Sequence, residues 1–140
     1  MKTYEDIRVQ ASHVDHLREI MPSYQDSGVC TAVAMAATLD IDFDMAIYTI
    51  QDTLGNRPGT FGWNAYGRCF EALGYRLIPV REYTAKTVTT LERDPFLRKG
   101  RFVVSVSQGR HAVALVDGKV IDWSEGRRHR IHRIWKIEEA

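Results

Sequence analysis

The spacing of apolar residues changes along the chain, from a helical pattern in the first half to a strand pattern in the second. Small and apolar residues occupy every side of the segment after Ser27, which is typical of a helix buried all round, and Ser27 is a potential N-cap. We therefore predict a central helix over residues 29–39. A shorter helix is expected ahead of it, around residues 14–20.

Two more helices follow from apolar residues at helical spacing. The first is expected to begin at Asp42 or Asp44 and to stop at Gly55, because these residue types favour helix starts and ends. The second is expected from about residue 63 to 73, with Gly74 as its stop. Three glycines and a proline over residues 55–62 indicate an irregular connection between them.

Beyond Gly74 the apolar residues form short runs rich in β-branched and aromatic side chains, separated by Gln-Gly, Asp-Gly and Ser-Glu-Gly turn signals. A brief helix or turn is expected over residues 88–99. The expected strands cover residues 75–80, 102–107, 111–116, 119–123 and 130–137. Helices first and antiparallel strands afterwards predict an α+β domain in which a sheet packs on a helical layer.

Length and composition favour one ordinary globular domain. The chain has 140 residues, of which 44% are hydrophobic and 26% charged, and this mix is typical of a folded protein of one domain. Neither a run of 18 apolar residues nor a charged segment followed by an apolar stretch at the start is present. We therefore expect neither a membrane span nor a signal peptide, and a cytoplasmic location by default.

The two cysteines, Cys30 and Cys69, are too few for a disulfide scaffold or for an ordinary structural zinc site. Cys30 falls in the first turn of the predicted central helix, where backbone N–H groups and the helix dipole favour a thiolate. That position suits a nucleophile, although apolar neighbours leave a purely structural role open. Cys69 lies within the third predicted helix beside apolar residues, and we interpret it as a core cysteine.

A thiolate nucleophile needs a base, and the base needs a partner that orients it. If Asp117 and Gly118 form a two-residue turn, His111 and Asp122 lie on one face of the hairpin as diagonal neighbours, about 7 to 8 Å apart at Cβ. An imidazole-to-carboxylate hydrogen bond is within reach at that spacing. The amide of Gln25, together with the backbone N–H of Cys30, could donate to an oxyanion.

These residues resemble a minimal papain-like cysteine peptidase, nearest to the small bacteriocin-processing C39 type. The resemblance rests on Gln25-Asp-Ser-Gly-Val-Cys30-Thr-Ala, Gly109-Arg-His111-Ala-Val-Ala-Leu-Val and Val120-Ile-Asp122-Trp123, in the order Gln, Cys, His, Asp. It implies a papain-like fold with Cys30 as nucleophile, His111 as general base, Asp122 as orienting residue and Gln25 as oxyanion donor. The flanks of the cysteine, Val29 and Thr31, depart from the family's usual Asp-Cys-Gly or Ser-Cys-Trp.

The expected activity is that of a thiol hydrolase on a protein or peptide substrate, most simply a cysteine peptidase, without a cofactor. Deamidation of glutamine and acyl transfer need the same groups and stay open. A catalytically silent scaffold is the alternative, because residues 98–140 carry 10 Lys or Arg against 5 Asp or Glu. Residues 127–136 could bind nucleic acid or an acidic partner, although a half-buried final strand explains them more simply.

Two histidine pairs invite a metal interpretation. His13 and His16 share the spacing of His129 and His132. Neither pair has cysteines near it in the sequence, and the cysteine-pair pattern of a nucleotide deaminase is absent. We therefore expect no metal site, and we interpret His129 and His132 as belonging to a solvated strand edge.

Overall fold

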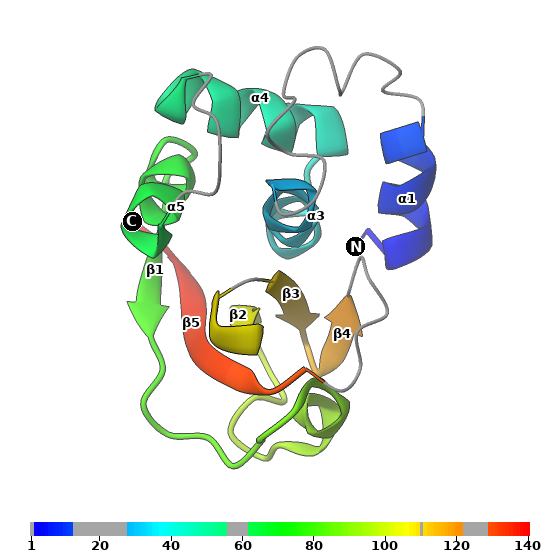
Figure 1. Cartoon of the computed structure of the whole chain (residues 1–140), viewed down its shortest axis with the longest axis vertical. Coiled ribbons are helices and arrows are strands. Elements are labelled where there is room, and N and C mark those ends of the chain that lie inside the picture. Colours follow the sequence, from blue (N-terminus) through cyan, green and yellow to red (C-terminus); the bar gives the residue numbers. More distant parts are fainter. Residues whose placement is uncertain (1, 13–27, 56–61, 110, 122–128) are drawn as a thin grey trace.

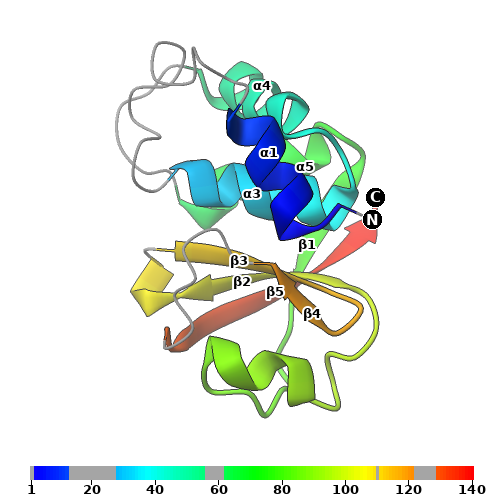
Figure 2. The same cartoon turned by 90° about the vertical axis from the view of Figure 1, so that its right-hand side faces the viewer.

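The computed structural model describes residues 2–12, 28–55, 62–109, 111–121 and 129–140. A layer of helices covers one face of a single antiparallel sheet, and a short irregular segment covers the other face (Figures 1 and 2). The expected α+β class is confirmed. The helix expected at 14–20 and most of the connection expected at 55–62 lie outside the described residues.

The helical layer contains α1 (Tyr4–Ser12), α3 (Gly28–Leu39), α4 (Phe43–Leu54) and α5 (Trp63–Glu71). Helix α3 lies against the sheet, α4 lies on the side of α3 away from the sheet, and α1 and α5 flank α3 (Figure 1). Helix α3 is buried on every side, as its composition predicts. Its fully buried apolar side chains are Ala32, Val33, Ala34, Met35, Ala36 and Ala37, and the side chain of Thr38 is fully buried as well.

The helix ends follow the capping signals with two exceptions. Helix α4 begins after Asp42 and stops at Gly55. The φ of Gly55 is 73°, a backbone conformation that residues other than glycine rarely adopt. Helix α5 ends two residues before the expected position, because the chain turns at Ala72 ahead of Gly74. Helix α1 was not predicted, since its fully buried Ile7 stands among exposed polar residues.

The sheet has the strand order β1-β5-β2-β3-β4, with every neighbouring pair antiparallel. Its strands are β1 (Tyr75–Pro79), β2 (Arg101–Val106), β3 (His111–Val116), β4 (Lys119–Ile121) and β5 (Ile131–Glu139). All five expected strands are present: β3 has the expected ends, the ends of β1, β2 and β5 differ by one or two residues, and the expected end of β4 lies outside the described residues. Two 3-10 segments, η2 (Val88–Arg93) and η3 (Ser107–Gly109), complete the described elements.

The hairpin of β3 and β4 has the predicted turn. Asp117 and Gly118 both have positive φ, 47° and 82°, which is the pattern of a type I′ turn. Val116 pairs with Lys119, as the two-residue turn requires, and the pairing continues as far as Ile121. The predicted register is confirmed over these residues.

Strand alternation separates two cores. On β3, Ala112, Ala114 and Val116 face the helices and share a cluster with α3, whereas Val113 and Leu115 face η2 on the opposite side. The small residues towards α3 allow the helix and the strand to approach closely. This close packing fixes where the start of α3 lies relative to the sheet.

Strand β5 is an interior strand, paired with β1 on one side and β2 on the other. His132 is exposed in the part of β5 that precedes its pairing with β1, which covers residues 135–139, so its expected solvated position is confirmed, whereas His129 lies ahead of the strand and is half-buried. The plainer interpretation of this segment, a half-buried final strand, is confirmed, since Ile134, Trp135 and Ile137 are buried. The β2–β5 register shifts between Ser105 and Val106 in a β-bulge, which makes consecutive β5 residues share an orientation and breaks the simple alternation.

Candidate functional site

The direction of α3 along the sheet follows from a contact at its C-terminal end. The guanidinium of Arg101, the first residue of β2, donates a hydrogen bond of 3.1 Å to the carbonyl oxygen of Thr38. A twelve-residue helix is about 18 Å long and a six-residue strand about 20 Å. The start of α3 therefore lies over the end of β2, where β3 begins, and Figure 2 shows both starts at the same end of the molecule.

Cys30 is the third residue of α3 and is 4% exposed. Its position in the first turn agrees with the prediction, and it belongs to the core cluster on the helix-covered face. The next residue, Thr31, accepts a hydrogen bond of 2.6 Å at its carbonyl oxygen from the hydroxyl of Tyr66 in α5. Helix α5 thus fixes the position of the turn that carries Cys30.

His111 is the first residue of β3 and is half-buried. Its ring lies 5.2 Å from the ring of His129, centroid to centroid, at a tilt of 45°. Nδ1 of His129 is hydrogen-bonded to the hydroxyl of Ser107. His129 and Ser107 are neighbours of the candidate base that the sequence did not identify, because no local pattern pairs residue 129 with the start of β3.

The turn that leads into His111 has an uncommon backbone. Ser107, Gln108 and Gly109 have φ of 51°, 59° and 88°, three consecutive residues in the left-handed region. Residues other than glycine adopt this backbone region at a cost in free energy. Such backbone strain is found more often at functional sites than elsewhere. The strained turn places Gly109 two residues before the candidate base.

Two of the four predicted site residues can be located. Cys30 and His111 lie at the starts of two elements, α3 and β3, that pack on each other. Gln25 and Asp122 lie outside the described residues, so their oxyanion and orienting roles stay predictions. The hairpin keeps the predicted register up to Ile121, the residue before Asp122.

Cys69 differs from Cys30 in its surroundings. It is fully buried in α5, and its thiol donates to the carbonyl oxygen of Ala65 at 3.4 Å. Burial raises the pKa of the Cys69 thiol to about 11. Cys69 is therefore a core thiol, as the sequence indicated, and almost none of it is thiolate at neutral pH.

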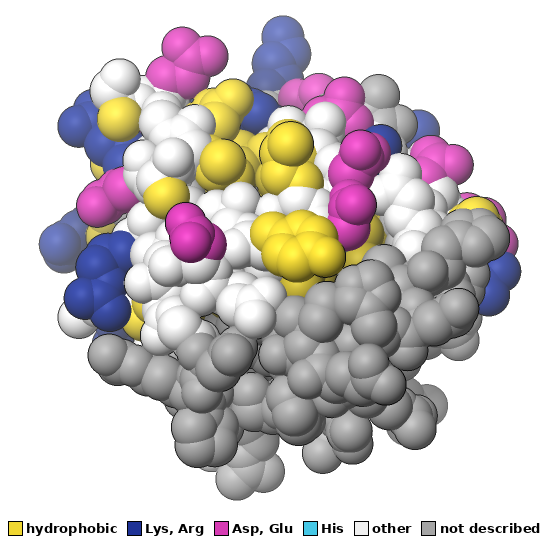
Figure 3. All heavy atoms as spheres, turned by 90° about the horizontal axis from the view of Figure 1, so that it is seen from above, with side chains coloured by type: hydrophobic (Ala, Val, Ile, Leu, Met, Phe, Trp, Pro, Cys, Tyr) yellow, Lys and Arg dark blue, Asp and Glu magenta, His cyan; other side chains and the backbone are white. Residues whose placement is uncertain are grey.

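The other surfaces offer less chemistry. Across the described part of the chain, no cluster of three or more His, Cys, Asp or Glu side chains is arranged to hold a metal ion. The same residues include no helix that could span a membrane. An open groove of about 830 Å³ along α4 has Met45 and Tyr48 exposed among aspartates, but no cysteine or histidine among its described lining residues (Figure 3).

The basic residues of β5 do not form one surface. Lys136 pairs with Phe102 and shares the side of Ile134, which faces η2, whereas Arg133 follows the parity of Trp135 on the helix-covered side. Phosphate binding needs cations on one face. Over 129–136, the part of the basic segment that the structure describes, the charges are divided between both faces.

No protein-family model matches the chain, and no curated protein or solved structure is similar to it. A functional proposal therefore rests on the chain's own residues.

Proposed function

We propose that the protein is a thiol hydrolase of papain-like fold, in which Cys30 is the nucleophile and His111 the general base. The supporting observation is that α3 runs parallel to β3, so the turn that carries Cys30 and the first residue of β3 lie at the same end of the sheet. Asp122 is the proposed orienting residue and Gln25 the proposed oxyanion donor.

The reaction is that of an activated thiol. His111 takes the proton of the Cys30 thiol, and the thiolate sulfur attacks the carbonyl carbon of an amide bond. The protonated imidazole then gives its proton to the leaving nitrogen, and an acyl-enzyme thioester remains. Water attacks the thioester, His111 accepts a proton from that water, and the thiol is restored as the carboxylic acid leaves.

Peptide hydrolysis is the simplest outcome of these steps. If the attacked amide is a glutamine side chain, the same steps release ammonia. If an amine replaces water as the final acceptor, they transfer the acyl group. A scaffold that binds nucleic acid or an acidic partner through residues 127–136 is the competing proposal, and the division of basic residues between both faces of β5 gives it less support.

Selective alkylation tests the hydrolase proposal. Iodoacetamide at pH 7, followed by peptide mass spectrometry, should modify Cys30 at least a hundredfold faster than Cys69, because the pKa of Cys69 is about 11. The His111→Ala variant should slow the labelling of Cys30 about tenfold or more and leave Cys69 unchanged. Lys136→Ala is the control, since it removes an exposed side chain on the opposite side of the sheet.

Equal and slow labelling of both cysteines in the folded protein would contradict the hydrolase proposal. Salt-dependent retention on nucleic acid that is lost in an Arg130→Gln, Arg133→Gln variant would support the scaffold instead. A mixed peptide library incubated with the native protein and with Cys30→Ala would then show whether a bond is cut and what flanks it.

A further inference from the structure

Ser105 is a buried polar residue whose hydroxyl has no hydrogen-bond partner within the described part of the chain. It is fully buried in the middle of the sheet, on β2, and it is the one residue of the described chain whose buried side-chain oxygen has no partner. Buried hydroxyls are nearly always hydrogen-bonded, because an unmade bond costs free energy. A bound ligand would supply the missing hydrogen-bond partner of the Ser105 hydroxyl.

The hydroxyl of Ser105 faces the space beside Gly109. A Cβ atom built on Gly109 would lie 3.9 Å from Ser105 Oγ, 4.0 Å from His132 Nδ1 and 4.0 Å from Trp63 Nε1. Three polar atoms from β2, β5 and α5 therefore surround one point that glycine leaves open. Gly109 itself is exposed, whereas the Ser105 oxygen is buried, so a ligand would have to approach from the Gly109 side.

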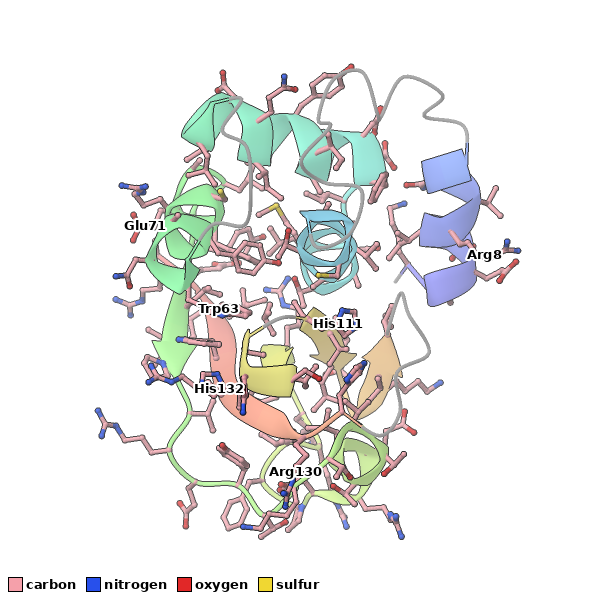
Figure 4. The ribbon with its side chains drawn as sticks, viewed as in Figure 1. Arg8, Trp63, Glu71, His111, Arg130 and His132 are labelled. Carbon is pink, nitrogen blue, oxygen red and sulfur yellow. The ribbon has the colours of Figure 1, made fainter. Side chains whose placement is uncertain are left out.

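The indole of Trp63 is held firmly in place. It stacks on Trp135 with centroids 4.1 Å apart and an interplanar angle of 14°, and it meets Tyr66 edge to face at 5.3 Å. Tyr66 in turn donates to the carbonyl of Thr31, next to Cys30. Figure 4 shows Trp63 and His132 on the α5 and β5 side of this end of the sheet, with His111 towards β3.

We propose that Ser105, Trp63 and His132 form a binding subsite for an acyl oxygen, either a carboxylate or a carbonyl oxygen of the substrate. An indole nitrogen only donates, a hydroxyl can donate, and an imidazole Nδ1 donates when it carries its proton. Three donors that converge from separate elements suit an oxygen with several lone pairs, and a carboxylate makes the stronger bonds because it is charged. The role of this subsite in binding substrate rests on the proposed hydrolase function.

The subsite also has a shape that the sequence explains. The β-bulge between β2 and β5 gives the strand an extra residue at His132, and that extra residue brings an imidazole beside Ser105. A side chain at position 109 would fill the space and would also strain the backbone, since φ there is 88°. The β-bulge at His132, the turn before β3 and the missing side chain of Gly109 together leave one small open space.

Titration of the Trp63 indole N–H signal tests the subsite. In ¹H–¹⁵N spectra at pH 7, sodium acetate should shift this signal downfield in a saturable way, and N-methylacetamide should do so more weakly. Sodium chloride at equal ionic strength is the control for salt. The signal is assigned by its loss in Trp63→Phe, which preserves an aromatic ring against Trp135.

The matched variants are Ser105→Ala and Ser107→Ala. The first should weaken acetate binding at least tenfold without lowering the melting temperature, and the second should leave it unchanged, because the hydroxyl of Ser107 already bonds His129. Trp63→Phe, followed through the His132 ring signals, should weaken acetate to a similar extent. The same titration on Cys30→Ala protein should give the native result.

The outcomes separate the subsite from the hydrolase. A shift that never saturates, that chloride reproduces, or that Ser105→Ala retains would overturn the subsite, whatever Cys30 does. Failure of selective alkylation would overturn the hydrolase and leave acetate binding intact. If acetate and N-methylacetamide both bind, the subsite takes carbonyl oxygens in general; if only acetate binds, it selects a carboxylate.

Discussion

The two faces of the sheet are packed in different ways. On the helix-covered face, alanines of β3 meet alanines of α3, and the partner element is a regular helix. On the other face, large side chains such as Phe102 and Leu115 meet Leu91 and Leu97 from η2 and the turns after it. Polar hydrogen bonds hold that irregular segment, mainly those of Asp94 and of the capping box between Thr87 and Thr90.

The two faces have different roles: one sets the position of Cys30 relative to His111, and the other buries large side chains. Small residues on both sides of the α3–β3 contact leave little freedom in the distance between the helix and the strand, so this face sets where Cys30 lies relative to His111. The β2 and β3 side chains that face η2, such as Phe102 and Leu115, are larger than the alanines of β3 and so each contribute more to stability. We therefore expect substitutions on the η2 face to change mainly the stability, and substitutions on the helix-covered face to change the reactivity of the Cys30 thiol.

The largest effect is expected from a cavity on the η2 face. Leu97 is fully buried there, and Leu97→Ala should lower the free energy of unfolding by about 2–5 kcal/mol. Urea unfolding measures the loss. The ratio of Cys30 to Cys69 alkylation rates in the folded variant should stay at the native value. A collapse of that ratio under native conditions would show that the two faces are coupled.

The next effect concerns the carboxylate that organises the same segment. Asp94 is buried and accepts hydrogen bonds of 2.7–2.8 Å from the backbone N–H groups of Thr84, Ala85 and Phe96. Asp94→Ala should cost about 2–4 kcal/mol, because three backbone donors lose a charged acceptor. Glu139→Ala, on an exposed residue at the end of β5, should change stability by no more than about 0.5 kcal/mol.

The same carboxylate predicts a pH dependence. Burial alone would raise the pKa of Asp94, but the N–H groups of Ala85, Phe96 and Thr84 outweigh it, and the pKa lies below the usual 3.8. The unfolded chain then binds the proton more readily than the folded one, so the stabilisation is complete above about pH 4 and is lost as the pH falls below it. The stability gap between native protein and Asp94→Ala should narrow below pH 4. A gap that narrows between pH 7 and 5 would contradict this assignment.

The helix and the hairpin that position Cys30 and His111 could be predicted from the sequence. The unbroken small and apolar pattern of α3 has few alternatives to a buried helix, and the Asp117-Gly118 turn leaves only one register for its hairpin. These local signals were sufficient to place Cys30 at a helix start and His111 at a strand start. Helix α1 also carried a signal, since Thr3 and Asp6 cap it reciprocally through side chain and backbone.

The contacts between distant segments could not be predicted. The pairing of β5 between β1 and β2, and the bulge that brings His132 beside Ser105, depend on which strands meet in space. The contact of His111 with His129 depends on the same pairing. A strand pattern gives the faces of a strand but not its neighbours, so the subsite around Gly109 had no counterpart in the sequence.

The smallest effect on stability, and the sharpest test of the comparison, comes from the helix-covered face. Ala114→Val adds two carbon atoms between β3 and α3 and should cost about 1–3 kcal/mol, since this contact has no room for them. Because the added volume pushes the helix from the strand, Cys30 alkylation should slow several-fold in protein that is still folded. Val113→Ile, the neighbouring residue facing η2, should affect stability by a similar or smaller amount and leave the Cys30 rate unchanged. Equal effects of the two variants on Cys30, measured by the same iodoacetamide assay, would show that the helix–strand contact does not set the reactivity of the thiol.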